Sequence, residues 1–358
     1  MHQPERRVSG PVTFAAGKRF GRYGHESESI VRDVQVRETE GFKAIMKAWM
    51  TIVDFPDMRQ LYHDISNPAW YAREALKGKR YSAEDIGMFA VAVGAYQHSR
   101  AFGAAGQFIS VLINDNEEGE FAINSRHLSA PFTVIGYRNT KNFVIEGDAG
   151  RWLGMEMTEG RILVRGDSGE SIGRYMSGGI IEVEGDSGAN TGECLAGGEV
   201  IVKGRAGCAP GYGILRGKVE IMKDAGDRAG DHMEGGELVI HGNAGISTGR
   251  SMKSGKITVY GDVGDFLGGF ETQRAVQGYL WMNPPFVWRN PLSSLIAAPT
   301  PPKRDGEIIV HGNAGEKVGE NMEGGVIRLY GDYKSIGRNI KGRVYHKDRL
   351  IAGTEPDR

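Results

Sequence analysis

Apolar residues return at intervals of nineteen positions over most of this chain. From Asp148 onward each unit opens with a turn and closes on alternating apolar residues, as in DAGRWLGMEMTEGRILVRG and then DSGESIGRYMSGGIIEVEG. Positions 15 and 17 of the unit are almost always Val, Ile or Leu, and position 10 is usually Met or Leu. Alternation with a period of two is typical of a strand with one buried face. Each unit therefore predicts one short strand and one unbranched core side chain.

Glycine is the compositional outlier and follows the same repeat. The chain has 54 glycines among 358 residues, about twice the usual share of roughly 7%. They recur at positions 3, 7, 13 and 19 of the unit, where we expect sharp corners or backbone with positive φ. Asp or Asn at position 1 suits a turn, because its side chain can bond the local backbone.

The nineteen-residue period predicts a coiled sheet. A strand–helix unit needs about thirty residues, whereas nineteen suit one turn of a three-sided coil whose strands pair from turn to turn. Because parallel crossovers are right-handed, we predict a right-handed parallel β-helix of about nine rungs over residues 130–348. An insertion at about 270–304 interrupts its seventh rung, and residues 349–358 form a C-terminal tail. Calcium-binding β-rolls repeat with a different period, of about nine residues.

Residues 1–129 lack the repeat and predict an N-terminal α+β capping domain. Apolar spacing and capping residues predict three helices, over Gly41–Ile65, Asn67–Leu76 and Ser82–Arg100. The last of these opens with Ser82 and Asp85, which resemble a capping box. Phe108–Ile113 and Phe121–Asn124, separated by an acidic stretch, predict a β-hairpin. We expect this domain to cover the open edge of the first rung.

Two features predict a partner-binding surface. Position 18 points outward, and its side chains should form one row with neighbours roughly 5 Å apart. The row contains His241, Tyr260, His311 and Tyr330, and an apolar row at position 16 lies on the same face. The insertion carries residue types that anchor interfaces, namely Trp281, Phe286, Trp288 and Arg289. The insertion either docks a partner or folds back as a flap.

Catalytic and metal-binding patterns are weak. The two cysteines, Cys194 and Cys208, show no Cys-x-x-Cys spacing, and two thiolates do not hold an ordinary iron–sulfur cluster or a four-Cys zinc site. We expect Cys208, at a corner, to be a buried and inert thiol. His25 and the His63–Asp64 pair are interpreted as ordinary surface features. The sequence therefore predicts no catalytic, cofactor-binding or metal-binding residue in this chain.

Charge and hydropathy limit the partners and the cellular locations that we expect for this chain. The formal net charge is −1, which gives no general attraction to nucleic acid or to an anionic membrane. No apolar run reaches the eighteen or so residues that a membrane-spanning helix needs. The first residues lack the apolar stretch of a signal peptide, so we expect a cytoplasmic location.

The motif chain Gly-x-x-x-Gly-x-x-Met-x-Gly-Gly-x-Ile-x-Val-x-Gly-Asp resembles the GXGXG β-helix family. The resemblance covers about residues 130–348 and is closest at Gly211–Gly236. The family includes the β-helical subunit of formylmethanofuran dehydrogenase, the related subunit of the bacterial formyltransferase/hydrolase complex, and the C-terminal domain of the glutamate synthase large subunit. The uninterrupted regularity is more similar to the formylmethanofuran dehydrogenase subunit than to the glutamate synthase domain.

The resemblance implies a scaffold rather than a catalyst. In those families the β-helix carries no reacting group and packs beside chains that hold amidohydrolase, molybdenum or tungsten, flavin or iron–sulfur centres. This chain is then expected to bind other protein subunits in an oxidoreductase or C1 (formyl) transfer complex. A glutamate-synthase-like module, a free-standing polysaccharide-active β-helix enzyme and a homo-oligomeric structural protein stay open as alternatives. Residues 1–129 and the insertion depart from the family pattern and leave the particular complex open.

Overall fold

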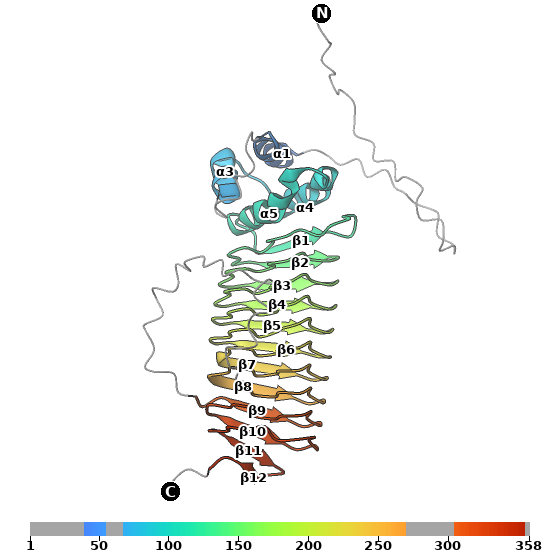
Figure 1. Ribbon diagram of the computed structural model, residues 1–358. Helices are drawn as coiled ribbons and strands as arrows, with labels where there is room; N and C mark the ends of the chain where they lie inside the picture. The colour runs from blue at the N-terminus through green and yellow to red at the C-terminus, as the bar shows by residue number, and fades with distance from the viewer. Residues whose placement is uncertain (1–38, 55–66, 270–303, 355–358) are drawn as a thin grey trace, which may run out of the picture. The chain divides into compact units, whose positions relative to one another are not determined.

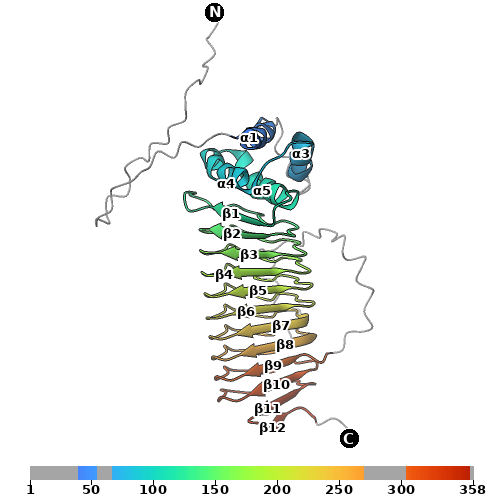
Figure 2. The same ribbon diagram turned by 180° about the vertical axis from the view of Figure 1, so that it is seen from behind.

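The main feature of the computed structural model is a single coiled sheet (Figures 1 and 2). The structure describes residues 39–54, 67–269 and 304–354. In these ranges twelve strands pair in chain order, in about ten turns roughly 19 residues apart. All neighbours are parallel except the last two. The strands are β1 Glu120–Asn124, β2 Asn142–Glu146, β3 Arg161–Val164, β4 Ile180–Val183, β5 Glu199–Val202, β6 Lys218–Ile221, β7 Glu234–Ile240, β8 Ser254–Val259, β9 Glu307–Val310, β10 Val326–Leu329, β11 Arg343–His346 and β12 Arg349–Ala352. The predicted parallel β-helix is confirmed.

The core of the coil is built by the inward positions of the repeat. Ile181 pairs in register with Val200, and this register continues from rung to rung. Side chains at positions 15 and 17 are buried in every complete rung, and the position-10 side chains Met157 and Met176 have no exposed surface. Because each buried side chain stacks on its equivalent in the next rung, the apolar column is continuous along the coil.

Glycines of the repeat serve two different purposes. At positions 7 and 13 they have positive φ, as at Gly173 with 66° and Gly179 with 86°. In the complete units that the structure describes, no positive φ is found at positions 3 and 19, where glycine is needed for close approach. A Cβ on Gly166 would lie 2.2 Å from Asp148 Oδ1. Glycine is therefore required at positions 7 and 13 by the backbone conformation, and at positions 3 and 19 because a side chain would not fit.

The position-1 side chains bond the next rung instead of their own turn. Asp148 Oδ1 accepts a hydrogen bond from the Asp167 N–H at 2.9 Å, and Asp167 Oδ1 accepts one from the Asp186 N–H at 2.8 Å. The same bond recurs near the end of the coil, where Asn313 Oδ1 accepts from Asp332. The predicted local turn contact is therefore wrong: these carboxylates and amides link successive rungs.

Helices form the N-terminal part of the described chain. They are α1 Glu40–Val53, α3 Asn67–Leu76, α4 Ala83–Ala92 and α5 Ala105–Asn114, with short 3₁₀ helices η1 Val93–Tyr96 and η2 Arg100–Ala104. The predicted capping box is present, because Ser82 and Asp85 bond each other's backbone at the start of α4. Trp49 is fully buried and packs edge-on against Phe89 and Phe108.

The predicted hairpin is wrong in its first half and in its pairing. Phe108–Ile113 lies within helix α5, in which every residue from Ala105 to Ile113 is buried. A helix buried on all sides shows no one-sided periodicity, so its apolar run reads like a buried strand. The second half is the strand β1, but it pairs in parallel with β2. The coil therefore begins ten residues before the predicted position 130, within the region assigned to the cap.

Both ends of the sheet differ from the middle. At the start, α4 packs on β1, where a Cβ on Gly87 would lie 3.3 Å from the carbonyl oxygen of Ala122. At the other end the predicted tail contributes a strand, because β12 turns back and pairs antiparallel with β11. Lys347 and Asp348 make that turn with φ of 48° and 62°, the pair of positive values that a tight hairpin requires.

Candidate partner-binding face

The outward face of the sheet carries the row predicted at position 18. His241, Tyr260, His311 and Tyr330 each follow directly on a strand, β7, β8, β9 and β10 in turn. The insertion between β8 and β9 does not shift the register, because Val259 pairs with Val310. The four side chains therefore stand in one line, as predicted, and we call them the aromatic column.

The rings of the aromatic column stack face to face. Ring centroids lie 5.1 Å apart between His241 and Tyr260, 4.9 Å between Tyr260 and His311, and 5.4 Å between His311 and Tyr330. The corresponding interplanar angles are 15°, 6° and 14°. Stacked faces cover one another, so the column offers its ring edges, with the polar atoms they carry, to a partner. Tyr260 is more open than Tyr330, at 50% exposed surface against 38%.

Carboxylates hold both ends of the aromatic column. His241 Nε2 lies 2.8 Å from Glu220 Oε1, and Tyr330 Oη donates to Asp348 Oδ1 at 3.4 Å. Two hydrogen bonds hold the pKa of Glu220 below its usual value. The bond from Lys218 has the larger effect and the bond from His241 the next largest. Glu220 is therefore ionised at neutral pH. The column is thus a fixed strip of the surface rather than four independent side chains.

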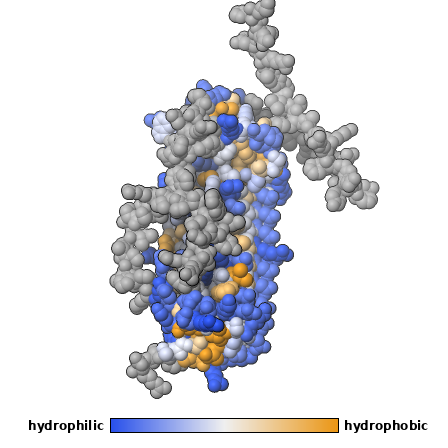
Figure 3. Space-filling model, in the orientation of Figure 1, coloured by the Kyte–Doolittle hydropathy of each residue, from blue (hydrophilic) through white to orange (hydrophobic). Residues whose placement is uncertain are grey.

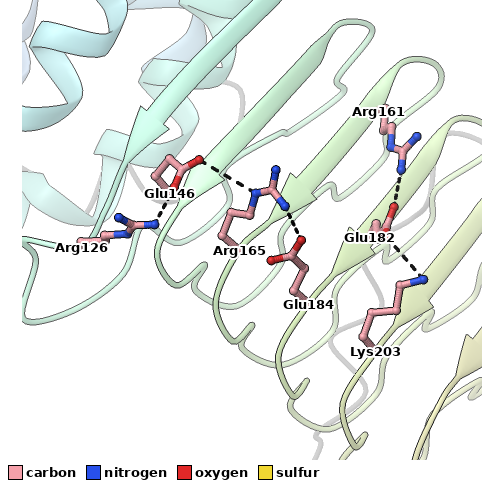
Figure 4. A network of polar contacts seen from close by, with 7 residues as sticks. All are labelled: Arg126, Glu146, Arg161, Arg165, Glu182, Glu184 and Lys203. Atoms are coloured by element: carbon pink, nitrogen blue, oxygen red, sulfur yellow. Dashed lines mark hydrogen bonds and ion pairs between the residues drawn. The ribbon is translucent and has the colours of Figure 1, made fainter.

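The other half of the same face carries ion pairs instead of rings (Figure 4). Its members, drawn in that figure, are Arg126, Glu146, Arg161, Arg165, Glu182, Glu184 and Lys203. Glu146 lies 2.7 Å from Arg126 and 4.0 Å from Arg165, which also pairs with Glu184. Each of these charges has an opposite partner on a neighbouring rung. Such a network is satisfied without a partner protein, and at an exposed surface it contributes little stability.

A second group of charges lies at the corner formed by position 8 of the repeat. The Asp231 side chain is only 2% exposed, and it accepts hydrogen bonds from His232 Nδ1 at 2.6 Å and Arg250 Nε at 3.1 Å. Burial on its own raises the pKa of Asp231, but the bonds from His232 and Arg250 outweigh it, so the pKa lies below its usual value. This carboxylate is a buried clamp between two rungs, and both of its oxygens accept hydrogen bonds.

The two cysteine thiols differ in exposure, and the prediction that Cys208 is buried is wrong. Cys208 is exposed and Cys194 is half-buried. The prediction failed because position 4 of the rung turns its side chain outward at the corner. Burial, with the negative charge of Glu193, raises the pKa of Cys194 to about 11. At neutral pH the Cys194 thiol is protonated, which does not suit a nucleophile.

An apolar groove under α4 was not predicted from the sequence. It has a volume of about 810 Å³ and lies between α4 and the outward face of β1 to β3. Met88 and Val91 of the helix and Val144 and Leu163 of the sheet are among the residues that line it. Sequence reasoning missed it because the position of α4 on the first strand depends on packing between segments that share no repeat.

Several predicted features lie outside the described residues. Trp281, Phe286, Trp288 and Arg289 of the insertion are among them, as are His25, His63 and Asp64. Within the described ranges, no three His, Cys, Asp or Glu side chains are grouped as metal ligands. Among the helices of those same ranges, none combines the length and the apolar character that crossing a membrane requires.

No protein-family model matches the chain, and no curated protein matches it significantly. The fold and the geometry of the outward face are therefore the observations on which a function can be argued.

Proposed function

We propose that this chain is a non-catalytic scaffold subunit of a cytoplasmic multi-subunit oxidoreductase or C1 (formyl) transfer complex. In this proposal it resembles the β-helical subunit of formylmethanofuran dehydrogenase and binds other protein subunits. The partner chains would carry molybdenum or tungsten, iron–sulfur or flavin centres, and this chain would bind none. The observation that supports the proposal best is the aromatic column, an exposed strip of stacked rings on an otherwise charge-paired sheet face.

The column has the properties of an interface anchor. Aromatic side chains contribute much of the free energy of protein association when a partner covers them. The sheet holds Tyr260 and His311 in fixed register, so binding them costs little conformational entropy. Outward residues at position 16 beside the first three rings are Val239, Thr258 and Ile309, and the one beside Tyr330 is Arg328, which is paired with Glu307. A partner surface of similar character would cover rings and aliphatic groups together.

The chemistry of the described side chains also favours a scaffold over an enzyme. Of the groups that could act as nucleophile or base, Cys194 has a pKa raised to about 11 and Asp231 is bonded on two sides. His241, at one end of the column, is bonded to Glu220 beside it. A polysaccharide-active β-helix enzyme would instead present free carboxylates along a groove on one face.

Native co-purification of the tagged full chain tests the proposal. We expect other chains to co-elute in fixed ratio and to contain molybdenum, tungsten, iron–sulfur or flavin, detected by metal analysis and absorbance. Tyr260→Ala should weaken that association by about 30-fold, the loss of a single interface anchor. Lys203→Ala, at the same repeat position in the ion-paired half, should leave association within about twofold.

Two results would contradict the proposal. A chain that elutes free of other polypeptides and cofactors would not be a subunit of a redox complex. A complex that survives Tyr260→Ala unchanged while Lys203→Ala disrupts it would place the interface on the ion-paired half instead. Circular dichroism of each variant establishes that the coil is still folded.

A further inference from the structure

The last strand of the sheet presents an edge that has no strand partner among the described residues. Strand β12 is final in the sheet order and, among the described strands, bonds only to β11. The opposite end of the sheet is different, because α4 packs closely on β1. Natural proteins cover or charge the edges of their sheets, since an open edge recruits another strand. The two ends of this coil are therefore not equivalent, and the β12 end is the one suited to accept a strand.

Apolar side chains surround that edge. Ile336, Ile340, Ile351 and Ala352 are partly exposed and pack against the end of the core. Figure 3 shows apolar residues gathered at the lower end of its view, where β11 and β12 lie in Figure 1. The inward side chain of the last parallel rung is His346, where the preceding rung has Leu329. The Nε2 atom of His346 is buried and has no hydrogen-bond partner in the described structure.

Positive charge forms the rim of the same end. Five basic residues of the last rung and hairpin have no ion-pair partner among the described residues: Lys334, Arg338, Lys341, Arg343 and Arg349. The ion pair found there joins Lys347 to Asp332 at 3.7 Å, with both side chains mostly exposed. On the sheet face of β2 to β6, by contrast, the basic residues are paired with Glu across neighbouring rungs. Residues 332–352 thus carry six basic side chains and two acidic ones, an excess of positive charge at this end of the coil.

We infer that this C-terminal end, residues 332–352, docks an acidic strand of another protein. The incoming strand hydrogen-bonds to the free edge of β12, its apolar residues cover the isoleucines, and its Asp and Glu side chains pair with the basic rim. This is β-strand addition, in which the main chain supplies affinity and the side chains supply specificity. A second copy of this chain fits poorly, because it would bring the same five positive charges face to face. The surface adjoins the aromatic column, because Tyr330 bonds to Asp348 in the turn before β12. It uses the edge of β12 and the basic rim rather than the rings, so the inference does not depend on the proposed function.

Binding of a designed peptide to the purified full chain tests the inference. The probe is a ten-residue peptide of alternating Val and Glu, with a Val and Lys peptide as its counterpart. Fluorescence anisotropy at low salt should show binding of the acidic peptide and at least tenfold weaker binding of the basic one. Hydrogen exchange should slow at the amides of 349–352 when the acidic peptide is bound, because an added strand protects them.

Charge-reversal variants locate the site. The double variant Arg343→Glu with Arg349→Glu should weaken binding of the acidic peptide by at least tenfold. The control is Lys79→Glu with Arg80→Glu, two exposed basic residues in the helical part, which should change binding by less than twofold. An equal loss of peptide binding in both double variants would show only a general charge effect and would overturn the inference.

Three further outcomes would also overturn it. Sedimentation of the chain alone would show dimers that Arg349→Glu alters if a second copy occupied the β12 edge. A single-stranded oligonucleotide that bound more tightly than the acidic peptide would make the basic rim a nucleic-acid site. Peptide binding without protection of 349–352 would exclude strand addition.

Discussion

The carboxylate of Asp148 accepts a hydrogen bond from the backbone N–H of Asp167 at 2.9 Å, one repeat further along the chain. The contact is possible because Gly166 has no side chain to occupy the space beside Asp148 Oδ1. Two positions of the repeat that look independent in the sequence, an acidic first residue and a glycine last residue, are thus one structural device.

Gly166→Ala should therefore destabilise the coil. The new Cβ would lie 2.2 Å from Asp148 Oδ1 and 2.9 Å from the backbone of Gly147, so side chain and backbone must both shift. We expect a loss of about 2 kcal/mol, in the range of overpacked sites, measured as a lower urea midpoint of unfolding. Gly119→Ala is the matched control, because nothing lies within 4 Å of its Cβ position. A midpoint that falls equally in both variants would refute the close-approach explanation.

The buried clamp at Asp231 leads to a second prediction. Asp231→Ala leaves Arg250 and His232 without the carboxylate to which both bond, and breaking a buried pair costs about 3–5 kcal/mol. Glu146→Ala removes a more exposed partner, at 37% side-chain exposure, and should cost less than about 1 kcal/mol. Urea unfolding at pH 7 compares the two. Equal losses would show that Asp231 is no more important than a surface ion pair.

The same carboxylate gives the coil a defined response to acid. Because the folded-state pKa of Asp231 is lowered, its stabilisation is complete above the unfolded value of about 3.9 and is lost as pH falls through the folded pKa. The stability difference between the wild type and Asp231→Asn should then be constant from about pH 5 to pH 7 and shrink below about pH 4. Thermal unfolding across that range measures it. A difference that grows on acidification would reverse the assigned sign.

The coil could be predicted because its information is local and repeated. Ile181 and Val183 alternate with outward residues and recur nineteen positions later, so strand and register follow together. The stacking of Tyr260 on His311 was also predictable across 51 positions, since the pattern resumes in phase after the insertion. The alternation within each strand and the spacing of the repeat are enough to predict both the strand register and this stacking.

Other parts depended on contacts that no single unit reveals. Helix α5 reads as a strand because burial on all sides removes its helical periodicity. In the sequence Gly166 is typical of a turn. In the structure glycine is needed there because a Cβ would collide with the side chain of Asp148, eighteen positions earlier. The Asp231–Arg250 clamp does have a signal in the sequence, because both residues occupy position 8 of successive units. Reading one position down the repeat, which finds the row at position 18, also places these two side chains together.

The two cysteines should react at very different rates with a thiol reagent. Cys208 is exposed, whereas Cys194 is half-buried with a pKa of about 11, so only about one thiol in ten thousand is ionised at pH 7. Mass spectrometry after brief maleimide treatment of the folded chain should find the label on Cys208. In Cys208→Ser the remaining thiol should react only slowly until the chain is unfolded in urea. Rapid labelling of Cys194 in the folded variant would contradict the burial and the pKa assigned to it.

The aromatic column should contribute more to partner binding than to the stability of the coil. Tyr260 stacks on His241 and His311, and losing two exposed stacking contacts should cost about 1–2 kcal/mol of unfolding free energy. Tyr260→Phe keeps the ring and the stacking and loses only the hydroxyl. If ring edges and apolar surface carry the interface, Tyr260→Phe should bind the partner chains within about threefold of wild type, while Tyr260→Ala falls about 30-fold. If instead both variants lose binding equally, the hydroxyl is the recognised group, and the column acts as a hydrogen-bond donor rather than as an apolar anchor.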